Sequence, residues 1–257
     1  MKINIFFLAA VCLILSCDKE KTDLKEIDGY PVAIGNEWLY DYSGKFLTAS
    51  GEEKNYNYEI RVKIEKDTVL NDTMNVLIFK AFDSYPENVS TSYMFMDTAG
   101  LKNYAYENPG MNVFALNQPE QFLFQTFHTS IKKKSFNSND IFYESIPRLN
   151  LPLPLHGDSK WTYLEPSGSI NWQIDKEVVG IENISLHGKN YTCFKVRWIY
   201  VKSSLSSTPE ITDWICEKGL VKRVTVLKDA SLTDEYGAEI EQADVTEELT
   251  VKEITLK

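Results

Sequence analysis

Apolar and polar residues alternate along several stretches of the chain. Residues 58–64 read Tyr-Glu-Ile-Arg-Val-Lys-Ile, and residues 194–198 read Phe-Lys-Val-Arg-Trp. Alternation with a period of two is typical of β-strands that bury one face. Polar segments at 70–73 and 186–189 separate apolar runs, as hairpin turns do. The pattern therefore predicts an all-β fold, a curved antiparallel sheet or open β-barrel whose hairpins follow one another along the chain.

Three short blocks of sequence occur twice, in the same order. The first contains Pro, Gly and then Trp-x-Tyr, the second contains Phe-Lys, and the third contains Gly-Leu and a following Lys. The copies span 30–40 and 153–163, 77–80 and 192–195, and 96–102 and 216–222. Their offsets, taken at the Trp, the Lys and the Gly, are 123, 115 and 119 residues. This regularity predicts a duplication, with one β half over residues 29–149 and a second over 150–257.

The chain begins with an apolar stretch that ends at a cysteine. Residues 1–16 hold Lys2, then about a dozen apolar residues and then Ser16, the layout of a signal peptide. The stretch is too short for a comfortable membrane span. Charged residues follow Cys17, and we expect 17–28 to form a flexible tether. The alternative is an ordinary secreted protein with a chance cysteine at the cleavage point.

Two of these patterns resemble known families. Ile14-Leu15-Ser16-Cys17 resembles the lipobox of bacterial lipoproteins, which implies cleavage before Cys17, acylation (palmitate) of the protein and a stable membrane anchor. The repeated Pro-x-x-Gly-x-x-Trp-x-Tyr units resemble uncharacterised cell-envelope lipoproteins of Bacteroidota. The general layout resembles, more remotely, the open half-barrels of the LolA/LolB carriers. Together the resemblances imply a lipid-anchored protein at the outer membrane, on its periplasmic face or on the cell surface.

Charge and motif content exclude several functions. The formal net charge of −10 argues against nonspecific binding to nucleic acid. His128, His156 and His187 are far apart and form no metal-ligand motif. The chain contains no Gly-x-Ser-x-Gly motif, phosphate-binding glycine loop or EF-hand loop. We expect no catalytic residues, no metal and no cofactor, and an enzyme is the least favoured class.

The two cysteines of the second half, Cys193 and Cys216, form a candidate disulfide. A hairpin register that places Trp198 opposite Ile211 also places these cysteines opposite each other, on one face of the sheet. The alternative is two separate buried thiols that act as small apolar residues.

The aromatic residues divide into two groups. Trp38, Tyr40, Trp161 and Tyr163 recur at one repeat position, which predicts a core corner in each half. Trp172 and Trp214 occur in the second half only and are candidate ligand-facing platforms.

Three sites fit an Asp-Ser/Thr-apolar sequence that resembles the O-glycosylation signal of Bacteroidota. The candidate acceptors are Thr68, Thr73 and Thr98.

The favoured function is a non-enzymatic, membrane-anchored protein that binds a ligand or partner through a curved β-sheet. One form of this hypothesis is a carrier whose concave face takes an apolar or lipid-like ligand. The alternative is a surface-exposed structural lipoprotein that interacts with an envelope protein or a glycan.

Overall fold

The computed structural model describes residues 24–84, 87–107, 141–166, 173–202, 208–233 and 239–257. These residues form strands and turns and no helix, which confirms the all-β prediction. The strands are β1 (Glu26–Ile27), β2 (Glu37–Thr48), β3 (Glu53–Leu70), β4 (Met74–Ser84), β5 (Glu87–Asp97), β6 (Gly100–Glu107), β7 (Phe142–Pro152), β8 (Leu155–His156), β9 (Lys160–Leu164), β10 (Gln173–Leu186), β11 (Lys189–Lys202), β12 (Glu210–Cys216), β13 (Gly219–Thr233) and β14 (Glu239–Thr255).

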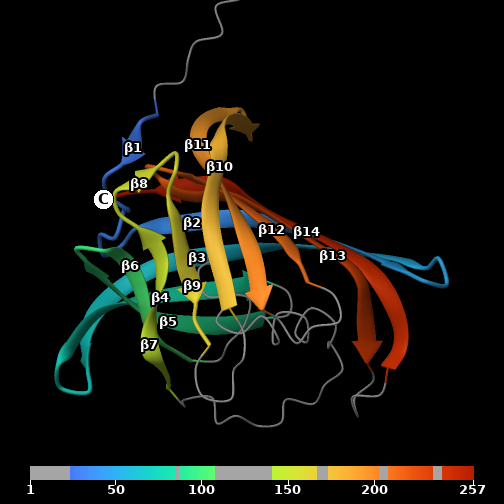
Figure 1. The fold of residues 1–257 in the computed structure, drawn as a ribbon, viewed down its shortest axis with the longest axis horizontal. Coiled ribbons are helices and arrows are strands. Elements are labelled where there is room, and N and C mark those ends of the chain that lie inside the picture. The colour runs from blue at the N-terminus through green and yellow to red at the C-terminus, as the bar shows by residue number, and fades with distance from the viewer. Residues whose placement is uncertain (1–23, 85–86, 108–140, 167–172, 203–207, 234–238) are drawn as a thin grey trace, which may run out of the picture.

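Twelve of the strands form one antiparallel sheet that wraps into an open barrel (Figure 1). The strand order is β7-β6-β5-β4-β3-β2-β14-β13-β12-β11-β10-β9, so sequential hairpins make up the sheet on either side of the β2–β14 pair. The edge strands β7 and β9 contact each other without a hydrogen-bonded ladder. β1 and β8 form a separate two-stranded sheet. The predicted curved sheet is therefore confirmed.

Both halves of the chain contribute strands in the same succession. The short strand β1 precedes the six strands β2–β7, and the short strand β8 precedes the six strands β9–β14. β1 lies in the segment 17–28 that we expected to be a flexible tether, but Ile27 is buried and pairs with Leu155, so the end of this segment belongs to the fold. The expected boundary between residues 149 and 150 lies within β7, which ends at Pro152. The duplication itself stays a prediction.

The alternation along β2 decides which side chains form the core. Trp38 and Tyr40 are fully buried, whereas Leu39, which lies between them, and Asp41, which follows, are partly exposed. The Trp38 indole donates to the Lys218 carbonyl oxygen at 2.7 Å, and the Tyr40 hydroxyl donates to the Leu220 carbonyl oxygen at 2.9 Å. Each ring thus fills the core while its polar atom keeps a partner.

The second aromatic pair has the same environment. Trp161 and Tyr163 are 7% and 2% exposed, and the Trp161 indole donates to the Leu149 carbonyl oxygen at 3.1 Å. This bond joins β9 to β7 and helps to close the barrel. The predicted core corner is confirmed in both halves.

The turns form at the predicted positions because their residues tolerate positive φ angles. Asn71 and Asp72 have φ angles of 51° and 57°, and His187 and Gly188 have φ angles of 48° and 75°. Two consecutive residues with positive φ are typical of the tight turns that join antiparallel strands. At Gly219, with φ of 107°, a Cβ atom would lie 2.9 Å from the Tyr30 hydroxyl oxygen, so both space and backbone require glycine there.

Candidate functional site

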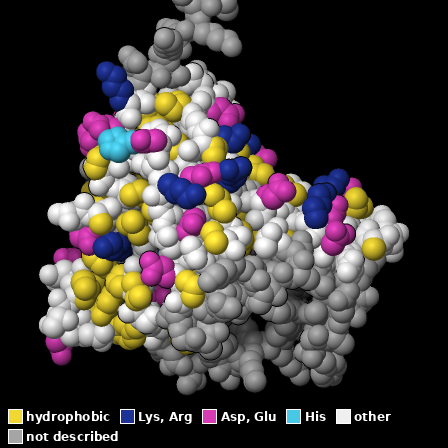
Figure 2. All heavy atoms as spheres, in the orientation of Figure 1, with side chains coloured by type: hydrophobic (Ala, Val, Ile, Leu, Met, Phe, Trp, Pro, Cys, Tyr) yellow, Lys and Arg dark blue, Asp and Glu magenta, His cyan; other side chains and the backbone are white. Residues whose placement is uncertain are grey.

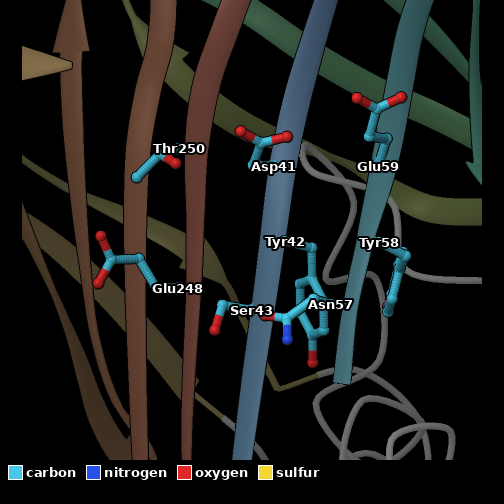
Figure 3. A pocket seen from close by; sticks show the side chains of 8 residues that line it. All are labelled: Asp41, Tyr42, Ser43, Asn57, Tyr58, Glu59, Glu248 and Thr250. Carbon is cyan, nitrogen blue, oxygen red and sulfur yellow. The ribbon is translucent and has the colours of Figure 1, made fainter. Parts of the chain in front are cut away.

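A polar groove lies on the outer face of the sheet, over β14, β2 and β3 (Figure 3). Its cavity volume is about 470 Å³. The lining residues are Asp41, Tyr42, Ser43, Asn57, Tyr58, Glu59, Glu248 and Thr250. We call this set the outer groove.

Strand register brings the polar members of the outer groove together. Asp41 on β2 lies opposite both Glu59 on β3 and Thr250 on β14. One step along, Ser43 lies opposite both Asn57 and Glu248. Residues directly opposite each other in a sheet share a face. Six polar side chains from three strands therefore form two adjacent rows.

The aromatic members of the outer groove contribute from below. Tyr42 is buried, and its hydroxyl donates to Glu247 Oε1 at 2.7 Å. Its ring lies 4.3 Å from the Tyr58 ring, centroid to centroid. Gly44 is needed beside it, because a Cβ atom there would lie 2.8 Å from the Tyr42 hydroxyl oxygen. The two rings support the floor of the groove and leave its rim polar.

Basic side chains set the charge of the groove. Lys252 Nζ lies 2.6 Å from Glu59 Oε1 and 3.4 Å from Asp41 Oδ1. The Lys252 ammonium, through its hydrogen bond and charge, lowers the pKa of Glu59. This carboxylate therefore stays ionised at a lower pH than an ordinary glutamate. Lys222 Nζ lies 2.9 Å from Glu248 Oε1. Three carboxylates and two ammonium groups thus line or border the groove, alongside hydroxyl and amide groups.

The tip of the β10–β11 hairpin reaches the same region. His187 Nε2 lies 3.3 Å from Asp41 Oδ2. His187 was predicted to be a turn residue, and it does lie in the turn between β10 and β11. The turn therefore borders a groove whose β2 and β3 residues are more than 100 residues away in sequence.

A second group of polar side chains lies on the core side of the sheet. Asp213 accepts two hydrogen bonds from Arg223, at 2.6 and 2.9 Å, and one from the Trp198 indole at 2.9 Å. Lys176 places its Nζ 4.1 Å from the Tyr163 ring centroid and 3.8 Å from the Trp198 ring centroid. We call these five residues the core ion cluster.

Burial controls protonation in the core ion cluster. Burial lowers the pKa of Lys176 to about 7, although the Asp213 charge opposes this shift. Burial alone would raise the pKa of Asp213, but the Arg223 charge and hydrogen bonds hold it below the ordinary value. The cluster thus contains one carboxylate for two basic groups, and Lys176 is the one of the two that loses its proton more readily.

The two cysteines of the second half are reduced and buried in this structure. β11 pairs with β12 so that Phe194 lies opposite Ile215 and Lys195 lies opposite Trp214. This is the register expected from the sequence, and it aligns Cys193 with Cys216. The disulfide itself stays a prediction. The predicted lipidation site, Cys17, lies outside the described residues.

Of the two candidate platform residues, Trp172 lies outside the described residues, and Trp214 is 8% exposed. The Trp214 indole donates to Glu182 Oε2 at 3.0 Å, and the Lys195 and Lys222 ammonium groups lie 5.2 and 5.3 Å from its ring centroid. A ligand role for either ring stays a prediction.

The candidate glycosylation sites lie in the first half. Thr73 and Thr98 are exposed in turns, and Thr68 is partly exposed on β3. The exposed pair meets the steric requirement for modification. Modification of any of the three stays a prediction.

Charged side chains of both signs are interspersed over the face formed by β10 and β12, and hydrophobic side chains gather over β5, β6 and β7 (Figure 2). Within the described ranges, no helix is long and apolar enough to cross a membrane. Nor do the described His, Cys, Asp and Glu side chains form a group of three or more that could hold a metal ion.

The sequence did not reveal the outer groove. Alternation alone indicates that Asp41 and Ser43 share one face of a strand, and likewise Asn57 and Glu59. The pairing of β2 with β14 is the missing information, since it brings in Glu248 and Thr250 from about 200 residues away. No local pattern in the sequence specifies this long-range pair.

No family model matches the sequence, and a search of curated proteins gave no match. Among solved structures, the chain is similar to a Bacteroides fragilis protein described as an exported protein with a YmcC-like fold. The TM-score is 0.42 and the sequence identity is 10%, over 89% of this chain and 99% of the other. A similarity of this size does not indicate a function.

Proposed function

We propose that this chain is a non-enzymatic, lipid-anchored envelope protein whose outer groove binds a hydroxyl-rich ligand, a glycan. The observation that supports the proposal is the double row of polar side chains from β14, β2 and β3. Carboxylates accept hydrogen bonds, amides both donate and accept, and hydroxyls do either. Sugar hydroxyls need this mixture of partners.

The charges of the groove fit the same ligand class. Lys252 lowers the pKa of Glu59, and hydrogen bonds to an ionised acceptor are about twice as strong as neutral ones. Ser43 and Asn57 are exposed and lie opposite each other, so both are available to a ligand. An apolar ligand, the other hypothesis from the sequence, would have to lie against the two rows of six polar side chains.

Substitution of Asn57 tests the proposal. We expect a glycan array, followed by calorimetry on the best hit, to show binding by the wild-type protein. Asn57→Ala should weaken that binding about fivefold, since a neutral hydrogen bond contributes about 1 kcal/mol. Asn55→Ala is the matched control, because Asn55 lies on the same strand, is exposed and lies outside the groove. Equal affinities of the two variants, or no glycan binding by the wild type, would overturn the proposal.

The anchor is a separate part of the proposal. It is supported by the lipobox-like run before Cys17 and by the charged segment after it. In a bacterial host that processes lipoproteins, we expect the wild-type protein to incorporate labelled palmitate and to sediment with membranes. Cys17→Ser should abolish the label and release the protein, whereas Cys12→Ser, within the apolar run, should change neither. Retention of the label in Cys17→Ser would contradict the assignment.

A further inference from the structure

Two buried cysteines lie at corresponding positions of the neighbouring strands β11 and β12. The β11–β12 ladder runs through Arg197–Thr212 to Phe194–Ile215, and its next pair is Cys193 and Cys216. Directly opposite residues have Cβ atoms about 4.5–5.5 Å apart, whereas a disulfide needs about 3.5–4.5 Å. A small local adjustment therefore suffices to join them.

The two sulfur atoms already interact. Each thiol shifts the pKa of the other, and the Lys218 backbone N–H donates to the Cys216 sulfur at 3.4 Å. The Cys193 hydrogen bond, followed by that of Lys218, holds the pKa of Cys216 below its ordinary value despite burial. Cys216 is thus the better nucleophile of the pair, because the thiolate is the reactive form.

We propose that Cys193 and Cys216 form an intramolecular disulfide when the chain folds in the presence of a disulfide oxidant, either a protein disulfide or a small-molecule one. The Cys216 thiolate attacks one sulfur of the oxidant, which forms a mixed disulfide and releases one thiolate. Cys193 then loses its proton, and its thiolate attacks the Cys216 sulfur and releases the second. Two thiols of this chain are oxidised, and one external disulfide is reduced to two thiols.

Burial determines when the reaction takes place. Cys193 is fully buried and Cys216 is 4% exposed, so an external disulfide has little access to either sulfur in the folded chain. The exchange belongs to folding, before the neighbouring side chains pack, or to a local opening of β11 and β12. Once formed, the bond is shielded from reductants for the same reason. It would link two strands next to Trp214, and neither cysteine lines the outer groove.

Mapping of the free thiols tests the proposal. The full chain, exported to a bacterial periplasm, is denatured with an alkylating reagent in the absence of reductant, digested and analysed by mass spectrometry. We expect the peptides that carry Cys193 and Cys216 to appear as one linked species, two hydrogen atoms lighter than their sum. After reduction, both cysteines should be alkylated. Full alkylation of both cysteines without reductant would overturn the proposal.

A stability measurement gives a second, independent readout. Cross-linking restricts the unfolded chain, so the oxidised protein should melt several degrees above the reduced protein. The Cys193→Ala/Cys216→Ala double variant should show no such response to reductant. If this variant does not fold, refolding the wild type with oxidised or reduced glutathione supplies the same comparison. Identical melting temperatures in the two glutathione buffers would contradict a cross-link. None of these results depends on glycan binding, so they are separate from the test of the outer groove.

Discussion

At the scale of single residues, the least expected side chain is Lys176. It is 5% exposed, and its Nζ lies over the rings of Tyr163 and Trp198. The carboxylate of Asp213, whose charge acts on Lys176, is already bonded to Arg223 and Trp198. An ammonium group in this position loses its hydration and gains only partial compensation from the rings and from Asp213. The pKa of Lys176 is lowered because the lost hydration outweighs this compensation.

The same residue predicts how stability depends on pH. Burial lowers the pKa of Lys176 to about 7 in the folded chain, against the ordinary value of 10.5. Between these values the unfolded chain binds more protons, so the free energy of unfolding should rise as the pH rises from about 7 to about 10. The gain from this group is on the order of 4 kcal/mol, since each pKa unit corresponds to about 1.36 kcal/mol.

Substitution isolates the contribution of Lys176 from those of other titrating groups. Chemical denaturation across this pH range should show a smaller rise in stability for Lys176→Met than for the wild type. Lys189→Met serves as the control, since Lys189 is exposed at the start of β11. If Lys176 had an ordinary pKa in the folded chain, stability would rise with pH equally in the wild type and in Lys176→Met. The lowered pKa assigned to Lys176 would then be wrong.

Among the elements, the sequence predicted the positions of strands and turns better than it predicted which strands pair with each other. The alternation at 58–64 and 194–198 lies within β3 and β11, and the polar segments at 70–73 and 186–189 form turns. The β11–β12 register was also derived from the sequence, because a hairpin fixes its own pairing once the loop is located. These are local relations, and alternation with turn chemistry determines them.

Other relations between elements are not local. β2 pairs with β14, and its Trp38 and Tyr40 bond to the turn and strand around Lys218 and Leu220. Nothing in either segment indicates the other. The sequence did not predict the core ion cluster for a related reason. Lys176 and Asp213 occupy core-facing positions of their strands, and alternation alone would place polar residues toward solvent.

At the scale of the whole molecule, each half supplies an edge that the other half covers. The ladder between β2 and β14 runs from the Glu37–Thr255 pair to the Thr48–Ala243 pair. β7 also contacts β9, so two junctions join the first half to the second, and β1, which precedes the first half, pairs with β8. A half without its partner would expose long unpaired strand edges and a large part of the apolar core.

This arrangement predicts the behaviour of separated halves. The chain can be divided between β7 and β8, after Pro152, without interrupting a strand. We expect each fragment alone to show no cooperative thermal unfolding, because its edge strand and core face lack partners. Mixed or co-expressed, the fragments should associate and recover one transition, and the intact chain should also unfold in one step.

The Trp38 side chain provides a check on this cooperativity. It belongs to the first half, yet its indole bonds to the Lys218 carbonyl of the second half. Trp38→Phe removes this bond and part of the buried ring. It should therefore lower the melting temperature of the intact chain and weaken the association of the fragments. If the two halves instead melt separately in circular dichroism or calorimetry, or if one fragment folds alone, they are independent domains. If the fragments associate and unfold in one shared transition, the two halves fold as one unit. That result is expected if the predicted duplication was followed by packing of the two copies against each other along β2 and β14.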